Sequence, residues 1–256
     1  MADDAVHSND FIEIDGGVFD IYSGDDGIHA DKTVEISGGD IGIWECYEGI
    51  ESTDITIRDG SFHIESSDDG LNCADGSGGL DFHPTAPSGT YSLCIDGGYL
   101  AVYAQGDGLD SNGDIEMTGG TVIIHGPTRS DNAALDSGDR EGSIIVDGGF
   151  LVGAGSSRMA ESPAPSSRQD HKLLTFGRKS AGTLFHIESS DGKDIVTFGP
   201  SKQYESIIVS SADLEDGATY NVYFGGTYTG GTETDGLYEG GAYTGGTLDT
   251  RLSFSL

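Results

Sequence analysis

The chain has 256 residues, of which 42 are glycine and 6 are proline, with 35% hydrophobic residues and a formal net charge of −32 at pH 7. This composition allows a long, narrow hydrophobic core, and no apolar run reaches the length of about 18 residues that a membrane span needs. The strong negative charge repels phosphate backbones, so we expect no nucleic-acid partner.

A repeated acidic turn marks the first 150 residues. The segment Asp25-Asp26-Gly27-Ile28-His29-Ala30 has counterparts that begin at residues 3, 47, 68 and 106. Within them Asp4, Asp26, Glu48 and Asp69 are spaced 22, 22 and 21 residues apart, so one coil of chain returns a carboxylate to the same place. Residues 1–150 hold 31 acidic and 4 basic residues, a net charge of 4 − 31 = −27.

The segments between these turns predict short strands. Each acidic turn follows a β-branched stretch and a glycine turn, as in Val34 to Gly39, and a further strand such as Val18 to Tyr22 comes next. Alternating apolar and polar residues predict strands with one buried face. We therefore expect an all-β parallel β-helix with coils of about 22 residues and three short strands per coil. A leucine-rich repeat and a nine-residue calcium β-roll do not fit the pattern.

The acidic column predicts a bound cation. Adjacent parallel strands lie about 4.8 Å apart, and partly buried carboxylates at that spacing raise each other's pKa unless a cation intervenes. A hard ion with oxygen ligands, calcium before magnesium, suits aligned turns that offer side-chain and backbone oxygens. The expected ligands are Asp4, Asp25, Asp26, Glu48, Asp68, Asp69, Asp107 and Asp110.

Histidines and cysteines give weaker signals. His7 and His29 occupy equivalent positions of the repeat, and the same column continues with Glu51, Asn72, Asp110 and Asp136. We expect exposed polar residues there, because two histidines are too few for a transition-metal site. Cys46, Cys73 and Cys94 lack CxxC spacing, so buried thiols are expected rather than a disulfide framework or a zinc site.

Two insertions interrupt the coils, one between Asp75 and Tyr91 and one over residues 126–132. Loops that project from one side of a solenoid commonly form its binding face. Phe82, His83 and Tyr91 are candidates to stack on sugar rings, and Arg129 is a candidate partner for a uronate carboxylate. Plain connecting loops are an equally open interpretation.

The character of the sequence changes near residue 153. We predict a domain over residues 1–152, an irregular linker over 153–171, and a small antiparallel β unit over 172–256 without the repeat. That unit would cover the last coil, which otherwise exposes unpaired strand edges.

Several motifs bring a known family into view: GDDGIHAD, SSDDGLNCADG, GDGLDSNGDIEMTGG, GPTRSDNAALDSG, FGPSKQYESIIVSS and GGTYTGGT. They resemble the bacterial carbohydrate-binding-domain family of right-handed parallel β-helices, related in fold to pectate lyases, over nearly the whole chain. The resemblance implies a secreted or cell-surface protein, calcium at the acidic turns, and affinity for plant polysaccharides such as cellulose or polygalacturonate. The residues Met1 to Asp4 have no leader character, and the repeat is already in mid-cycle, so we expect a longer precursor whose signal segment is missing here.

Three functions follow as hypotheses. The first is a non-catalytic, calcium-stabilised polysaccharide-binding protein. The second is a calcium-dependent pectate-type lyase, for which Arg129 is the only loop base that could reach the acidic turns. The third is a structural or adhesive surface protein. The sequence leaves the polysaccharide, the number of ions and the oligomeric state open.

Overall fold

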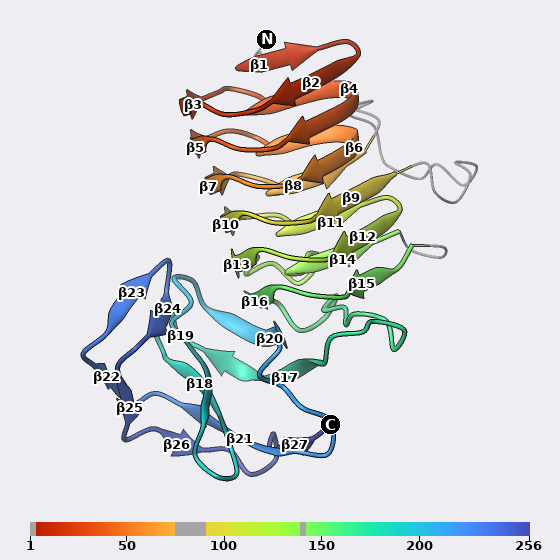
Figure 1. Cartoon of the computed structure of the whole chain (residues 1–256). Helices are drawn as coiled ribbons and strands as arrows, with labels where there is room; N and C mark the ends of the chain where they lie inside the picture. Colours follow the sequence, from red (N-terminus) through yellow and green to blue (C-terminus); the bar gives the residue numbers. More distant parts are fainter. Residues whose placement is uncertain (1–3, 75–90, 139–141) are drawn as a thin grey trace.

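The computed structural model describes residues 4–74, 91–138 and 142–256, and every regular element within these ranges is a β-strand. Two large sheets build a stack of windings, each winding being one repeat of the chain, and further antiparallel strands follow at its C-terminal end (Figure 1). The described residues hold no helix of the length and apolar character needed to cross a membrane.

The first sheet has ten strands, which come from the segment after each acidic turn. Its parallel pairs carry one winding onto the next, because Ile28 lies beside Val6 and Ile50, and Leu71 lies beside Ile50 and Leu109. The strands are β1 (Val6–Ser8), β2 (Phe11–Ile14), β4 (Ile28–Ile36), β6 (Ile50–Ile57), β8 (Leu71–Cys73), β9 (Ser92–Ile95), β11 (Leu109–Ser111), β12 (Asp114–Met117), β14 (Leu135–Ser137) and β15 (Ile144–Val146).

The second sheet has eight strands and is mixed. Six parallel strands, one from each winding, are β3 (Val18–Tyr22), β5 (Asp40–Glu45), β7 (Ser61–Ser66), β10 (Tyr99–Ala104), β13 (Thr121–His125) and β16 (Phe150–Gly155). The sheet then continues with two antiparallel strands, β20 (Tyr204–Ser210) beside β16 and β17 (His171–Lys179) beside β20.

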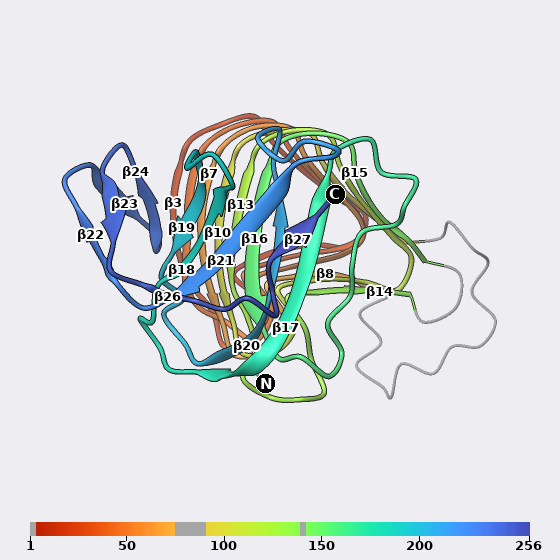
Figure 2. The same cartoon turned by 90° about the horizontal axis from the view of Figure 1, so that it is seen from below.

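The remaining strands form a seven-stranded antiparallel sheet and a two-stranded ribbon, which lie below the stack in Figure 1 and in front of it in Figure 2. The sheet contains β18 (Phe185–Ser189), β19 (Asp194–Phe198), β21 (Thr219–Phe224), β23 (Thr232–Thr234), β24 (Leu237–Glu239), β26 (Thr247–Leu248) and β27 (Phe254–Ser255). The ribbon pairs β22 (Thr227–Thr229) with β25 (Ala242–Thr244).

Two hydrophobic cores result. The first lies between the two large sheets and contains buried residues from every described winding, including the fully buried Ile28, Ile50, Leu71 and Leu93. The second lies on the opposite face of the eight-stranded sheet and joins β13, β16 and β20 to the antiparallel sheet. Residues such as Ile123 and Val152 point into this second core, which explains why β13 and β16 are apolar on both faces.

Glycine follows Asp26, Glu48, Asp69 and Asp107 because successive windings touch there. A Cβ added to Gly49 would lie 2.3 Å from the backbone oxygen of Gly70, and one added to Gly70 would lie 2.4 Å from that of Gly108. No side chain fits at such distances, so the Asp-Gly-Ile pattern places a carboxylate at the turn, bare backbone in the contact, and an apolar side chain in the core.

The all-β class is confirmed, but the prediction of a right-handed parallel β-helix with three short strands per coil is wrong. Two of the three expected strands share one sheet, and in β4 and β6 they run together as single strands. The sequence between Ala30 and Thr33 has no glycine or proline to end the strand, which passes through an irregularity in register there. The result is a multi-sheet, sandwich-like arrangement whose parallel sheets curve into a barrel-like stack. The domain boundaries at residues 152 and 172 stay a prediction.

Candidate functional site

The acidic turns stack in a column, linked by hydrogen bonds from backbone to carboxylate. The Asp26 N–H donates to Asp4 Oδ1 at 3.2 Å, and the Glu48 N–H donates to Asp26 Oδ1 at 3.2 Å. Further along, the Asp107 N–H donates to Asp69 Oδ1 at 2.6 Å. One oxygen of these carboxylates therefore holds the next winding in place, and the other is directed to side chains or solvent.

His29 supplies positive charge to the windings nearest the N-terminus. His29 Nδ1 lies 2.8 Å from Glu51 Oε2 and 3.1 Å from Asp26 Oδ2, and His7 Nδ1 lies 2.8 Å from Asp4 Oδ2. Hydrogen bonds from the ring of His29 to the carboxylates of Asp26 and Glu51 raise the pKa of His29 to about 10, so its ring is an imidazolium at neutral pH. The expectation that these histidines are merely exposed polar residues misses this role for His29, whose side chain is 13% exposed.

No histidine, lysine or arginine is among the groups that shift the pKa of Glu48 or Asp69 in the windings that follow. Burial and then the charge of Glu51 raise the pKa of Glu48 to about 9, and burial and then Asp107 raise the pKa of Asp69 to about 8. Burial and the neighbouring carboxylates also raise the pKa of Asp110. Asn72 donates through Nδ2 to Glu48 Oε2 at 2.8 Å, and its buried Oδ1 makes no hydrogen bond within the described part of the chain.

These donors fit a hard cation. Oxygen atoms of Asp4, Asp25 and Asp26 lie within 4.8 Å of one another. Farther along the chain, the carboxylates of Asp68 and Asp69 both lie against Gly106. A Cβ added to this glycine would lie 2.2 Å from Oδ1 of Asp69 and 2.5 Å from Oδ1 of Asp68. Carboxylate oxygens and an amide oxygen without a partner are the donor set that calcium prefers.

The predicted sugar-stacking residues have varied positions. Phe82 and His83 lie outside the described residues. Tyr91 is only 7% exposed and belongs to the first core, which leaves little of its ring for a sugar. Arg129 is exposed and forms two hydrogen bonds with Asp131, at 3.2 and 2.7 Å, which raise the pKa of its guanidinium. This pairing keeps Arg129 protonated, and a lyase base must instead accept a proton.

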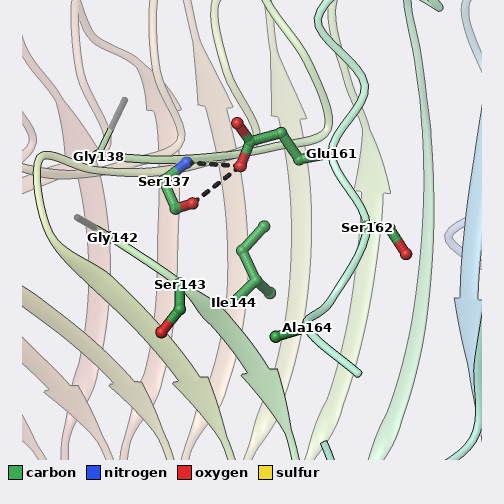
Figure 3. Close-up of a pocket in the computed structure, with 8 residues that line it drawn as sticks. All are labelled: Ser137, Gly138, Gly142, Ser143, Ile144, Glu161, Ser162 and Ala164. Carbon is green, nitrogen blue, oxygen red and sulfur yellow. Dashed lines mark hydrogen bonds between the residues drawn. The ribbon is translucent and has the colours of Figure 1, made fainter. Parts of the chain in front are cut away.

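The described residues include two surface hollows of similar size. One of about 390 Å³ lies beside the end of β14, where the backbone and hydroxyl of Ser137 donate to Glu161 at 3.1 and 2.8 Å (Figure 3). Its walls are mostly serine, glycine and alanine, with Ile144 and Glu161, and offer no aromatic ring for a sugar. The other, of about 380 Å³, lies beside Phe11 and the Lys32–Asp10 ion pair.

A row of aromatic rings crosses the outer face of the eight-stranded sheet. We call Trp44, His63, Tyr103 and His125 the aromatic row; their successive ring centroids are 4.6, 4.9 and 4.3 Å apart. His125 is buried against Phe198 of the second core, whereas Trp44 is 38% exposed at the other end. The indole N–H of Trp44 donates to Asp20 Oδ1 at 3.2 Å.

The hairpin of β23 and β24 forms a wall beside this row. Its turn residue Asp235 accepts hydrogen bonds from the hydroxyls of Tyr99 at 2.8 Å and Tyr103 at 2.9 Å, and its backbone oxygen contacts His125 Nε2 at 2.9 Å. Asp235 has φ 46°, a conformation suited to the Asp-Gly turn that it begins. Asp235 therefore holds the Tyr103 and His125 end of the aromatic row in place, and the Trp44 end stays open to solvent.

Sequence reasoning missed this row. The position that faces outward in β3, β5, β7, β10, β13 and β16 is occupied in turn by Asp20, Gly42, His63, Ala101, Ile123 and Val152. The change from polar to apolar along this column is the signal that the antiparallel sheet covers only the later windings. The single tryptophan of the chain lies in the uncovered part.

Comparison with known proteins gives one family. A family model described as "Carbohydrate-binding domain-containing protein" matches residues 1–80, which include Trp44, His63 and the first four acidic turns. The curated proteins contain no significant match, and neither do the solved structures.

Proposed function

We propose that this protein is a non-catalytic carbohydrate-binding protein that holds a glycan on the aromatic row, with Trp44 as the stacking platform. The family match over residues 1–80 supports carbohydrate binding in general. The observation that carries the proposal is the half-exposed indole of Trp44, supported from behind by His63 and flanked by the carboxylate of Asp20. An indole face packs against the C–H face of a sugar ring, and carboxylates accept hydrogen bonds from sugar hydroxyls.

Charge favours a neutral glycan on this surface. His63 Nε2 contacts Glu65 Oε1 at 3.1 Å, and two further exposed carboxylates are Glu45 at the end of β5 and Asp20 in the middle of β3. A polygalacturonate chain would be repelled by these carboxylates unless a cation intervened. We therefore assign a cellulose-type glucan to the aromatic row, consistent with a role on plant cell-wall material.

Calcium at the acidic column is the second part of the proposal. Asp4, Asp25 and Asp26 would hold one ion, and the lower group of Glu48, Asp68, Asp69, Asp107 and Asp110, with Asn72, would hold cations in place of protons. Calcium bound there would stabilise the windings and supply positive charge to an acidic glycan. An extracellular location fits this proposal, because millimolar calcium sites are typical of extracellular modules.

A pull-down on insoluble cellulose tests the first part. We expect Trp44→Ala to lower the affinity at least tenfold, and Tyr47→Ala, which removes another exposed aromatic side chain, to leave it unchanged. Equal binding by Trp44→Ala and the unmodified protein would refute the platform. Polygalacturonate binding with calcium or with EDTA tests the second part, and an ultraviolet assay for unsaturated uronate distinguishes binding from lyase action.

A further inference from the structure

A separate cluster of ligand-type side chains lies in the antiparallel sheet, away from the acidic column. His186 and Glu188 are two residues apart on β18, so they point to the same face, and Asp194 begins the neighbouring strand β19. A register irregularity between Ile187 and Glu188 places Glu188 opposite Asp194. One nitrogen and two carboxylate oxygens from these residues all lie within 4.8 Å of one another.

His186 presents a buried nitrogen to these carboxylates. The residue is 1% exposed, because the ring of Tyr243 stacks on it at 3.9 Å with an interplanar angle of 16°. Its Nδ1 is hydrogen-bonded to Thr197 Oγ1 at 2.8 Å, whereas Nε2 makes no hydrogen bond among the described residues. Nε2 lies 3.8 Å from Glu188 Oε2 and 3.7 Å from Asp194 Oδ1, too far for a hydrogen bond.

We propose that His186, Glu188 and Asp194 bind a divalent transition metal of the zinc class, with the remaining coordination positions open to water. An imidazole nitrogen suits zinc and its neighbours, whereas calcium and magnesium prefer oxygen alone. Bonds of about 2.0–2.2 Å separate the ligand atoms of a tetrahedral site by about 3.4 Å. The distances of 3.8 and 3.7 Å therefore need contractions of about 0.4 and 0.3 Å.

The surroundings suit such a site. Asp194 is 54% exposed and Glu188 is 28% exposed, so their carboxylates can rotate inward while the ring of His186 stays fixed. The hydroxyl of Tyr223 donates to Glu188 Oε1 at 2.7 Å and leaves Oε2 for the metal. An Nδ1 proton donated to Thr197 Oγ1 would leave the lone pair on Nε2, which is the usual outer-shell arrangement for a metal-binding histidine.

His29 of the acidic column does not offer a free ring nitrogen to a metal in the same way. His29 Nδ1 already lies within hydrogen-bond distance of both Asp26 and Glu51, at 3.1 and 2.8 Å. A proton shared with these carboxylates occupies the position that a metal would need. His29 is therefore a matched control for His186, since it is a second histidine within reach of two acidic side chains.

Cobalt titration of the 256-residue chain tests the proposal, after its metals have been removed with EDTA and excess calcium has been added back to saturate the acidic turns. We expect one equivalent of Co²⁺ to give visible d–d absorption that Zn²⁺ abolishes by displacement. His186→Gln should remove the signal and His29→Gln should keep it. Glu188→Gln and Asp194→Asn, which alter more exposed side chains, should each weaken Co²⁺ binding at least tenfold without loss of the fold.

A Co²⁺ signal that survives in Asp194→Asn and Glu188→Gln, or one that disappears in His29→Gln, would overturn the assignment. So would the lack of any d–d absorption in the unmodified protein. The cellulose pull-down is independent of this result, because Trp44 and His186 lie on different sheets.

Discussion

Replacing Glu48 with glutamine in metal-free protein tests whether buried carboxyl groups of the acidic column stay protonated in the folded chain when cations are removed. Burial and the charge of Glu51 raise the pKa of Glu48 from 4.5 in a model peptide to about 9 in the folded chain. Between these two values the unfolded chain loses the proton and the folded chain keeps it. The free energy of unfolding therefore falls as the pH rises through this interval.

The size of the effect follows from the number of protons retained. One retained proton lowers the free energy of unfolding by about 1.4 kcal/mol per pH unit. Asp69, whose pKa is about 8, is among the charges that raise the pKa of Glu48, so the two carboxyls are not independent and we count one proton for the pair. From pH 6 to pH 8 the loss is then about 3 kcal/mol, or roughly 6–11 °C in Tm for a chain of this size.

His29 acts in the same direction. Its pKa is raised from 6.5 to about 10 by hydrogen bonds to the carboxylates of Asp26 and Glu51, so the stability that it contributes is complete below pH 6.5 and is lost toward pH 10. Glu48→Gln isolates the carboxyl from this background, because the amide oxygen can still accept the hydrogen bond from Asn72. Glu45→Gln is the matched control, since Glu45 is exposed at the end of β5.

Thermal melts in EDTA and in calcium at pH 6 and pH 8 provide the assay. We expect Glu48→Gln to raise the Tm in EDTA at pH 8, to flatten its fall with pH, and to reduce the increase that calcium gives. A higher Tm in EDTA together with a smaller increase of the Tm by calcium is specific to a carboxylate that binds the metal. A metal-free protein that melts equally at pH 6 and pH 8, or a Glu48→Gln variant that melts lower than the unmodified protein at pH 8 in EDTA, would refute the reasoning.

Three further predictions concern packing and the aromatic row. Gly49→Ala should lower the free energy of unfolding by more than about 3 kcal/mol in denaturant melts, because the added Cβ meets the Gly70 backbone at 2.3 Å; Gly177→Ala, which meets nothing within 4 Å, should be nearly neutral. Leu93→Ala, at a fully buried position of the first core, should cost about 2–5 kcal/mol, and a cost below 1 kcal/mol would contradict the packing described. Asp235→Asn should cost about 1–3 kcal/mol and lower the pKa of Tyr103, which burial and the hydrogen bond to Asp235 raise; an unchanged ultraviolet titration of tyrosine would count against that contact.

The periodicity of the sequence by itself determined the register of the windings. A repeat that returns an acidic residue, a glycine and an isoleucine or leucine after 21 or 22 residues can bury its apolar side chains only if equivalent positions stack. Asp4, Asp26 and Glu48 therefore meet in one column, as expected. The sequence also excluded helices, because no segment repeats its apolar residues with a helical period.

The tertiary structure alone decided which carboxylates of the windings have a positively charged neighbour and which parts of the eight-stranded sheet are covered or exposed. His29 lies between Asp26 and Glu51 because the strand places it beside the turn, and Asp235 reaches Tyr99 across 136 residues of sequence. Glu188 meets Asp194 through an irregularity in strand register that no sequence period encodes. Such contacts depend on how the antiparallel sheet packs on the windings. The same packing leaves Trp44 exposed and His186 buried. A sequence repeat cannot encode this packing, because it determines only which equivalent positions of successive windings become neighbours.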